Sequence, residues 1–189
     1  TAMQNADGGF GYWPGNTSDA WGTNYAGHFL LEAERAGYLL PAGMRSSWVK
    51  FQKEHANRWV KTEGQSDLDQ AYRLYTLALA GTPDVGAMNR LKEVNLSTAA
   101  RWRLGAAWLL AGQRANADAV IAKAGTDVAA YHELTGTFGS DLRDEAMILE
   151  LDEQVPRVDD FLELPEHLAR DLRRLLEQRL RDEAPEASH

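Results

Sequence analysis

One helical plan recurs along the chain and limits the folds that are open to it. Segments 18–37, 66–81, 97–112 and 140–155 each begin with a serine, and the first three end in glycine. Serine is a favoured N-cap because its hydroxyl accepts a hydrogen bond from an otherwise unpaired N–H of the first turn. Glycine is favoured just past a helix because it readily adopts the left-handed conformation that closes the last turn. The plan predicts four capped helices.

The spacing of apolar residues divides the predicted helices into two kinds. Segments 66–81 and 97–112 are apolar nearly all round, which is typical of helices buried on more than one side. Segments 42–61, 84–94 and 114–125 keep a polar face and are expected at the surface. No stretch alternates strictly enough to predict a sheet. The sequence therefore predicts an all-α fold of alternating inner and outer helices, the arrangement of an α/α-toroid.

Composition excludes several classes of function. The chain has 189 residues, a formal net charge of −8, 44% hydrophobic residues and no cysteine. An acidic chain lacks the basic face that nucleic-acid binding needs. Without cysteine this stretch has no disulfide and no thiolate metal ligand. No secretory signal and no membrane-length apolar run is present, and the first residue is not methionine, so we expect the chain to be cut from a longer one.

We expect one domain over residues 1–181 and a disordered tail over 182–189. Within the domain, the last helix is predicted at 164–181. A loop that contains glycine and aromatic residues is predicted at 125–139.

A turn rich in glycine and aromatic residues precedes the first predicted helix. Residues 4–15 read QNADGGFGYWPG. Asp7-Gly8 is a favourable turn dipeptide, and Gly8, Gly9 and Gly11 permit a chain reversal. The aromatic residues bring large areas that favour burial. We expect this turn to connect an outer and an inner helix, with Phe10, Tyr12 and Trp13 sealing one rim of the ring.

Two motifs resemble a known family. The turn and the helix after it, residues 4–41, resemble the thioester-domain region of bacterial alpha-2-macroglobulins, relatives of the complement components. The second motif, FGSDLRDEAMILE at 138–150, is similar to another motif of the same region. The resemblance covers about residues 4–155. The family's helix pattern is matched by Trp21, Tyr25, Phe29, Leu30, Ala33, Gly37, Tyr38 and Pro41.

The resemblance implies a part of a broad-spectrum protease inhibitor that works by entrapment. In that family an activated thioester, formed by a C-x-E-Q motif, can acylate the attacking protease. This chain has no cysteine, so it carries no thioester of its own. The motif then lies upstream of this stretch, or the parent belongs to the thioester-less branch.

The resemblance further implies a partial ring of about seven to eight helices, with an open apolar edge that favours self-association. It implies proteases and other domains of the parent as partners, a periplasmic parent that is often lipid-anchored to the inner membrane, no cofactor and no enzymatic activity. The residues expected at the rim or at domain interfaces are Asp7, Gly8, Gly9, Phe10, Trp13, Trp21, Tyr25, His132, Asp141, Arg143 and Asp144.

Enzymatic toroids are the alternative. Asp67 and Asp69 do not form the acidic cluster of an isoprenoid cyclase, and they suit the N-terminal turn of a helix instead. A glycan-cleaving site would use paired carboxylates with aromatic platforms, and Asp141, Asp144 and Glu145 beside Tyr131 and His132 could form one. We expect instead that Asp141, Arg143 and Asp144 belong to a capped helix with an internal ion pair. A helical-repeat scaffold without a trapping role is the third alternative.

Packing explains most of the remaining aromatic and histidine residues. Four tryptophans stand at helical spacings typical of core anchors, namely Trp48, Trp59, Trp102 and Trp108. His28, among aromatic and aliphatic neighbours, is expected to be a satisfied interior residue. No histidine pair has the i, i+4 spacing of a zinc site, so we expect no metal.

Overall fold

The computed structural model describes residues 3–62, 66–125, 128, 130, 132, 140–154 and 174. Within this part of the chain there are seven helices and no strand, which confirms the all-α prediction. The helices are α1 (Ala20–Arg35), α2 (Met44–Arg58), α3 (Asp67–Leu79), α4 (Val85–Lys92), α5 (Thr98–Leu110), α6 (Arg114–Ile121) and α7 (Asp141–Gln154). Two isolated antiparallel bridges join Gln4 to Phe10 and His132 to Ser140.

The chain divides into two compact units, Thr1–Ala124 and Gly125–His189. The first holds α1 to α6 and the second holds α7. The predicted single domain over 1–181 stays a prediction. The predicted helix at 164–181 and the tail at 182–189 lie outside the described residues, apart from Arg174, and so does most of the loop at 125–139.

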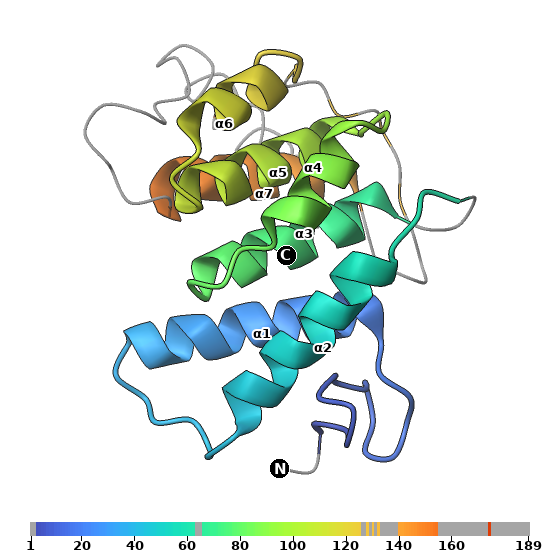
Figure 1. Cartoon of the computed structure of the whole chain (residues 1–189), viewed down its shortest axis with the longest axis vertical. Coiled ribbons are helices and arrows are strands. Elements are labelled where there is room, and N and C mark those ends of the chain that lie inside the picture. Colours follow the sequence, from blue (N-terminus) through green and yellow to red (C-terminus); the bar gives the residue numbers. More distant parts are fainter. Residues whose placement is uncertain are drawn as a thin grey trace, which may run out of the picture. The chain divides into compact units, whose positions relative to one another are not determined.

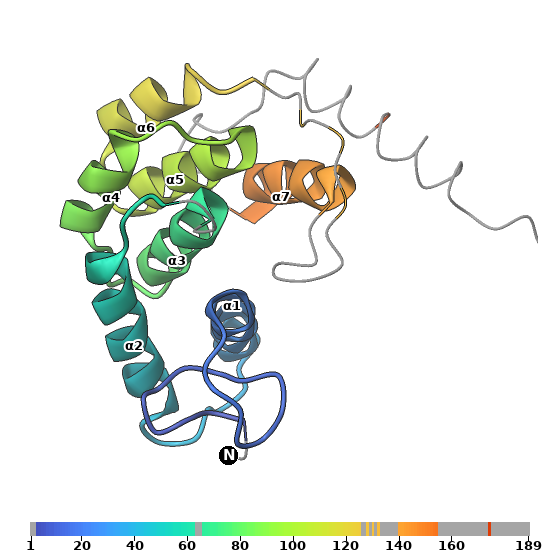
Figure 2. The same ribbon diagram turned by 90° about the vertical axis from the view of Figure 1, so that its right-hand side faces the viewer.

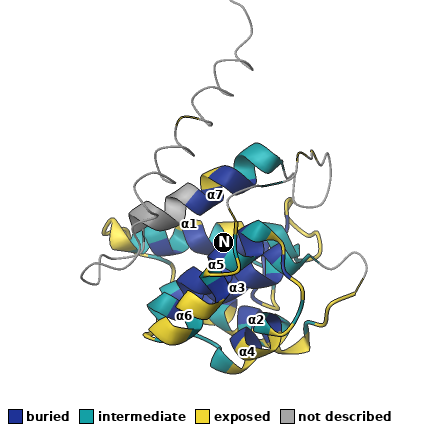
Figure 3. Cartoon of the chain, turned by 90° about the horizontal axis from the view of Figure 1, so that it is seen from above, coloured by how far each residue is buried: buried dark blue, intermediate teal, exposed yellow. Residues whose placement is uncertain are grey.

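The six helices of the first unit form two layers. Helices α1, α3 and α5 make one layer, and α2, α4 and α6 make the other (Figures 1 and 2). Helix α3 contacts α1 and α5 in its own layer and α2 and α4 in the other. Nearly every residue of α3 and most of α5 is therefore buried (Figure 3). The alternation of buried and polar helices predicted from the sequence is confirmed, and the ring of a toroid stays a prediction.

Three of the four predicted serine caps are present. The hydroxyls of Ser66, Ser97 and Ser140 accept hydrogen bonds from backbone N–H groups three residues on, at 3.1, 3.4 and 3.1 Å. The prediction for Ser18 is wrong. Asp19 caps α1 instead, because its Oδ1 accepts from the N–H of Gly22 at 2.6 Å.

The predicted glycine ends of α1, α3 and α5 are confirmed. Gly37, Gly81 and Gly112 have φ angles of 90°, 73° and 71°. In each case the N–H of the following residue bonds to a carbonyl five residues back, at 2.9 Å. This is the hydrogen bond that closes a helix with a left-handed glycine.

Tryptophans anchor the core as predicted, with one exception. Trp48, Trp102 and Trp108 are buried, whereas Trp59 is only half-buried because it forms the C-cap of α2. Helix α1 can approach Trp48 closely because residue 27 is glycine: a Cβ there would lie 2.1 Å from the indole ring.

Candidate functional site

Asp7 holds the opening turn together through two hydrogen bonds. Its Oδ1 accepts hydrogen bonds from the N–H of Gly9 at 3.0 Å and from the hydroxyl of Ser18 at 2.8 Å. Ser18 is therefore used to hold the turn, which is why it does not cap α1. Gly8 has a φ of 94°, and a Cβ there would lie 2.2 Å from the carbonyl oxygen of Ser47. A Cβ on Gly9 would lie 2.5 Å from Ser18 Oγ. Close packing against α2 and Ser18 thus requires glycine at positions 8 and 9, and Asp7 supplies the hydrogen bonds.

Phe10 links the opening turn to α1 through its buried side chain and two backbone hydrogen bonds. Its side chain is buried in a cluster with Leu31, Met44 and Trp48. Its backbone N–H donates to Thr23 Oγ1 at 2.9 Å, and its carbonyl accepts from the N–H of Asp19 at 2.9 Å. The turn therefore sets where α1 begins.

Several large apolar side chains are exposed around α1. Tyr25 and Phe29, one turn apart on α1, have exposed fractions of 66% and 68%. Trp21, one turn earlier, is half-buried and packs against Tyr72 with a centroid distance of 5.2 Å. We call Trp21, Tyr25 and Phe29 the aromatic stripe of α1. Contiguous apolar surface of this kind is typical of interaction sites.

The residues predicted for the rim differ in their environment. Phe10 lies in the core, whereas Tyr12 and Trp13 are exposed, Trp13 to 71%. Tyr38 and Leu39, in the connection between α1 and α2, are also exposed, at 71% and 99%. Partial desolvation of the Tyr12 hydroxyl, followed by its proximity to the Asp19 carboxylate, raises the pKa of the Tyr12 phenol. That Trp13 seals a ring stays a prediction.

The interior of the first unit holds a cluster of aromatic rings around a buried cation. Arg103 of α5 lies over the rings of Tyr72 and Tyr75 of α3, at 5.0 and 4.8 Å from their centroids. His28 of α1 meets both rings edge-on, and its Nδ1 is 3.0 Å from the hydroxyl of Tyr72. The prediction that His28 lies in the interior is confirmed, and its Nδ1 has the Tyr72 hydroxyl as partner. Cation–π contacts of this kind partly offset the cost of burying a guanidinium group.

Sequence reasoning missed a second buried polar network. The Nδ2 of Asn24 donates to the carbonyl of Asp69 at 3.0 Å, and its Oδ1 accepts from Gln52 Nε2 at 2.7 Å. Gln52 in turn accepts from Arg73 Nε at 3.1 Å. The network joins α1, α2 and α3. Its only signal in the sequence is that Gln70 and Arg73 interrupt an otherwise apolar helix.

The carboxylates of α3 have structural partners. Asp67 Oδ2 accepts from the N–H of Ser97 at 2.6 Å, and Asp67 Oδ1 is 3.4 Å from Lys61 Nζ. Asp67 thus joins the beginning of α3 to the beginning of α5. Both Asp67 and Asp69 lie in the first turn of α3, as the helix-terminus interpretation predicts.

The second unit confirms the predicted ion pair in α7. Arg143 Nη2 and Nε bond to Asp144 Oδ1 at 2.7 and 3.0 Å, on a helix that Ser140 caps. His132 is brought next to Ser140 by an isolated bridge. Asp141 lies in the first turn, and Asp144 and Glu145 are buried. Tyr131, the predicted sugar platform, lies outside the described residues.

The described residues contain no group of three or more His, Asp and Glu side chains placed to hold a metal ion. None of their helices is both long enough and apolar enough to cross a membrane.

The fold is that of a segment of bacterial alpha-2-macroglobulins. The chain is similar to Salmonella alpha-2-macroglobulin reacted with methylamine, with a TM-score of 0.77 and 24% identity over 95% of this chain and 12% of that one. It is similar to Escherichia coli alpha-2-macroglobulin activated by porcine elastase, with a TM-score of 0.78 and 23% identity over 96% of this chain and 17% of that one.

A third structure locates the matching region. It is a piece of the Escherichia coli protein running from domain MG7 to the C-terminus, with a TM-score of 0.75 and 23% identity over 94% of this chain and 29% of that piece. The similarity therefore lies in the C-terminal part of those proteins, and the chain spans 12% of the whole Salmonella protein. No protein-family model matches the sequence, and no curated protein matches it either.

Proposed function

We propose that the chain is a helical segment of a protease-trapping protein of the alpha-2-macroglobulin type, without enzymatic activity of its own. The observation that carries the proposal is that nearly the whole chain aligns with one region of these inhibitors, at TM-scores from 0.75 to 0.78. The motif residues that carry the resemblance have structural uses in this fold. Asp7, Gly8 and Gly9 shape the turn, and Phe10 anchors it.

In this proposal the exposed aromatic residues contact other domains of the parent. Tyr25 and Phe29 expose more than half of their surface, as do Trp13 and Tyr38. Side chains of this size lose favourable burial when they face water, about 25 cal/mol for each Å². A segment held inside a large multidomain protein would bury them against its neighbours.

The carboxylates favour this function over the two enzymatic alternatives, a glycan hydrolase and an isoprenoid cyclase. Asp144 is bonded to Arg143, and Asp67 is bonded to the backbone of Ser97. A catalytic acid or base must transfer a proton to or from the substrate. Carboxylates that are already bonded to structural partners are poor candidates for that role.

The natural setting follows from the same proposal. Proteases would be met through the parent protein, two of the similar structures being of alpha-2-macroglobulin activated by trypsin or by porcine elastase. The parent would work in the periplasm, anchored by a lipid to the inner membrane. Cell fractionation with an antibody against this chain tests the location, and recovery in the cytoplasm contradicts it.

A protection assay on the whole parent protein tests the function. The parent is mixed with trypsin, and cleavage is followed with a small chromogenic peptide and with a large protein substrate. Entrapment predicts that cleavage of the peptide persists while cleavage of the protein is lost. Equal inhibition of both substrates, or of neither, contradicts the proposal.

A matched pair of variants tests the domain contact. In the parent, Tyr25→Ser with Phe29→Ser should lower the thermal stability of this region and increase its cleavage by added protease. Val60→Ser is the control because Val60 is also exposed, at 61%, but lies beyond the end of α2 rather than on the aromatic stripe. If Val60→Ser lowers thermal stability and increases cleavage as much as the double variant does, the proposed contact between the aromatic stripe and another domain is contradicted.

A further inference from the structure

A pocket opens where three helix ends gather on one side of the first unit. The N-terminal ends of α1 and α3 and the C-terminal end of α2 lie together (Figure 1). The pocket has a volume of about 270 Å³, the space of roughly nine water molecules. This is slightly below the range of drug-sized sites, which begins at about 300 Å³. Its chemically active lining residues are His55, Arg58, Trp59, Ser66, Asp69 and Arg73.

Arg73 provides a buried cation on the wall of this pocket. Only 4% of the residue is exposed, and burial lowers the pKa of its guanidinium to about 10 although nearby Asp69 opposes the shift. Nε bonds to Gln52 and Nη1 bonds to Gln70, and both acceptors are neutral amide oxygens. Among the described residues Nη2 has no hydrogen-bond partner. A buried cation with neutral partners is stabilised by an added anion.

The remaining lining residues supply both donors and acceptors. Ser66 Oγ accepts from the N–H of Asp69 at 3.1 Å, so its own proton is still available for donation. His55 Nδ1 is 2.9 Å from the carbonyl oxygen of Phe51, which can only accept. Nδ1 therefore carries the proton, and Nε2 of the neutral ring is an acceptor.

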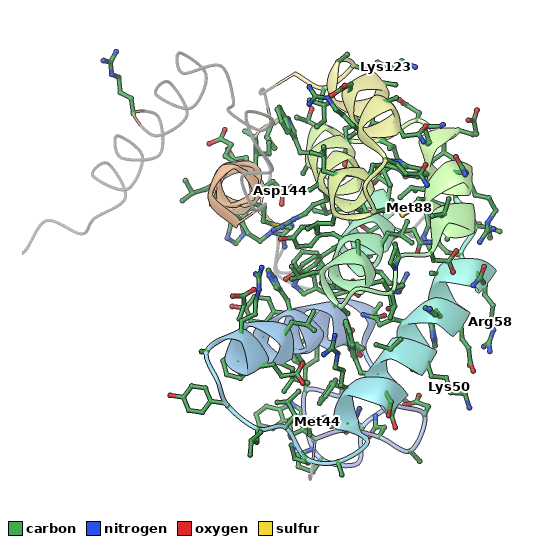
Figure 4. The ribbon with its side chains drawn as sticks, turned by 60° about the vertical axis from the view of Figure 1, so that its left-hand side comes forward. Met44, Lys50, Arg58, Met88, Lys123 and Asp144 are labelled. Atoms are coloured by element: carbon green, nitrogen blue, oxygen red, sulfur yellow. The ribbon has the colours of Figure 1, made fainter. Side chains whose placement is uncertain are left out.

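Two charged side chains and one ring complete the site. Asp69 places a carboxylate on the same wall as Arg73. Arg58 projects from the end of α2, and its side chain is 71% exposed (Figure 4). Trp59 is half-buried, so one part of the indole is available to an apolar group. The pocket thus combines a site for an anion, a site for a cation and an aromatic wall.

We propose that this pocket binds a small zwitterion of amino-acid size with an apolar side chain. The carboxylate accepts from Arg73 Nη2 and from the hydroxyl of Ser66, the ammonium group lies at Asp69, and the apolar side chain packs on Trp59. Arg58 at the mouth adds attraction for the carboxylate. The site does not depend on the trapping role proposed above.

Three probes of one shape test the charges separately, using the 189-residue chain and isothermal titration calorimetry. L-phenylalanine carries both charges, 3-phenylpropionate only the carboxylate, and phenethylamine only the ammonium group. We expect L-phenylalanine to bind at least about tenfold more tightly than either single-charge probe, as expected for the loss of one charge-assisted hydrogen bond. Equal affinity for the three probes, or no heat with L-phenylalanine at about 10 mM, would overturn the proposal.

Matched variants locate the binding. Arg58→Gln and Arg114→Gln each remove an exposed arginine from an i, i+4 ion pair, Arg58 with Glu54 at 3.0 Å and Arg114 with Asp118 at 3.5 Å. Only Arg58 lines the pocket. We expect Arg58→Gln to weaken the two carboxylate probes and leave phenethylamine unchanged, and Arg114→Gln to change nothing. Trp59→Ala should weaken L-phenylalanine at least about fivefold. Unchanged affinity in both Arg58→Gln and Trp59→Ala would place the binding elsewhere and overturn the proposal.

Discussion

Gly27 of α1 lies directly against the indole ring of Trp48 of α2, so that a Cβ at Gly27 would be 2.1 Å from the ring. The ring cannot move aside easily, because Trp48 is 1% exposed and its Nε1 donates to the carbonyl of Thr23 at 3.0 Å. This contact fixes the crossing of α1 and α2, and with it the position of the opening turn.

The first prediction concerns this contact. Gly27→Ala gains about 1 kcal/mol of helix propensity but overpacks the core at a cost of about 1–3 kcal/mol or more. Because Trp48 is held in place, we expect a net loss of about 2 kcal/mol in urea unfolding. The control is Gly86→Ala on α4, whose Cβ would meet no atom closer than 3.5 Å. That variant should gain stability, and a loss there as large as at Gly27 contradicts the packing argument.

The second prediction separates backbone strain from close packing in the opening turn. Gly8 and Gly15 both have positive φ, 94° and 84°, but only Gly8 faces a neighbour, the Ser47 carbonyl at 2.2 Å. Gly15→Ala should cost about 1–2 kcal/mol from strain alone. Gly8→Ala should cost clearly more unfolding free energy, about 3 kcal/mol or above, because the new Cβ also forces the turn to move away from α2. Thermal unfolding of the two variants measures the difference, and equal losses would show that packing does not matter.

The third prediction concerns the link between α3 and α5. Asp67→Asn weakens a charge-assisted bond to the N–H of Ser97, which is 2.6 Å long. We expect a loss of about 1–2 kcal/mol in the free energy of unfolding. Asp118→Asn is the control, because its ion pair with Arg114 is exposed and 3.5 Å long. It should cost no more than about 0.5 kcal/mol. If Asp67→Asn costs no more unfolding free energy than Asp118→Asn, the hydrogen bond from Ser97 to Asp67 does not stabilise the beginning of α5.

The fourth prediction follows from the pKa of Arg73. Burial lowers this pKa to about 10, well below its value in the unfolded chain. Above pH 10 the native state therefore binds fewer protons than the unfolded state, so this group makes stability rise with pH. The difference in unfolding free energy between the wild type and Arg73→Gln should be flat from about pH 6 to 8 and should shift in favour of the wild type as pH passes 10. Urea unfolding at pH 8 and 10.5 measures it, and a flat difference would contradict the shift.

The helices and their ends could be predicted because their signals are local. Ser66 and Ser97 cap helices through N–H groups three residues away. Around Gly37, Gly81 and Gly112 the closing hydrogen bonds span only five residues. The apolar spacing of α3 and α5 likewise predicts burial without knowledge of the neighbours.

The cap of α1 shows where local reasoning fails. Ser18 and Asp19 are both good N-cap residues by type. The choice between them depends on Asp7, eleven positions earlier, whose carboxylate takes the hydroxyl of Ser18 and leaves Asp19 to cap the helix. No pattern within one turn of helix contains this information.

Local residue patterns are enough to predict an all-α chain, where most helices begin and end, and which helices are buried, because capping and periodicity act within a few residues. The packing of the helices sets which atoms Gly8 and Gly27 face and which aromatic residues of the opening turn reach the core. It also joins Gln52, Gln70 and Arg73 in one buried network beside a pocket. These features depend on contacts between residues far apart in the chain, and such contacts exist only once the helices have packed.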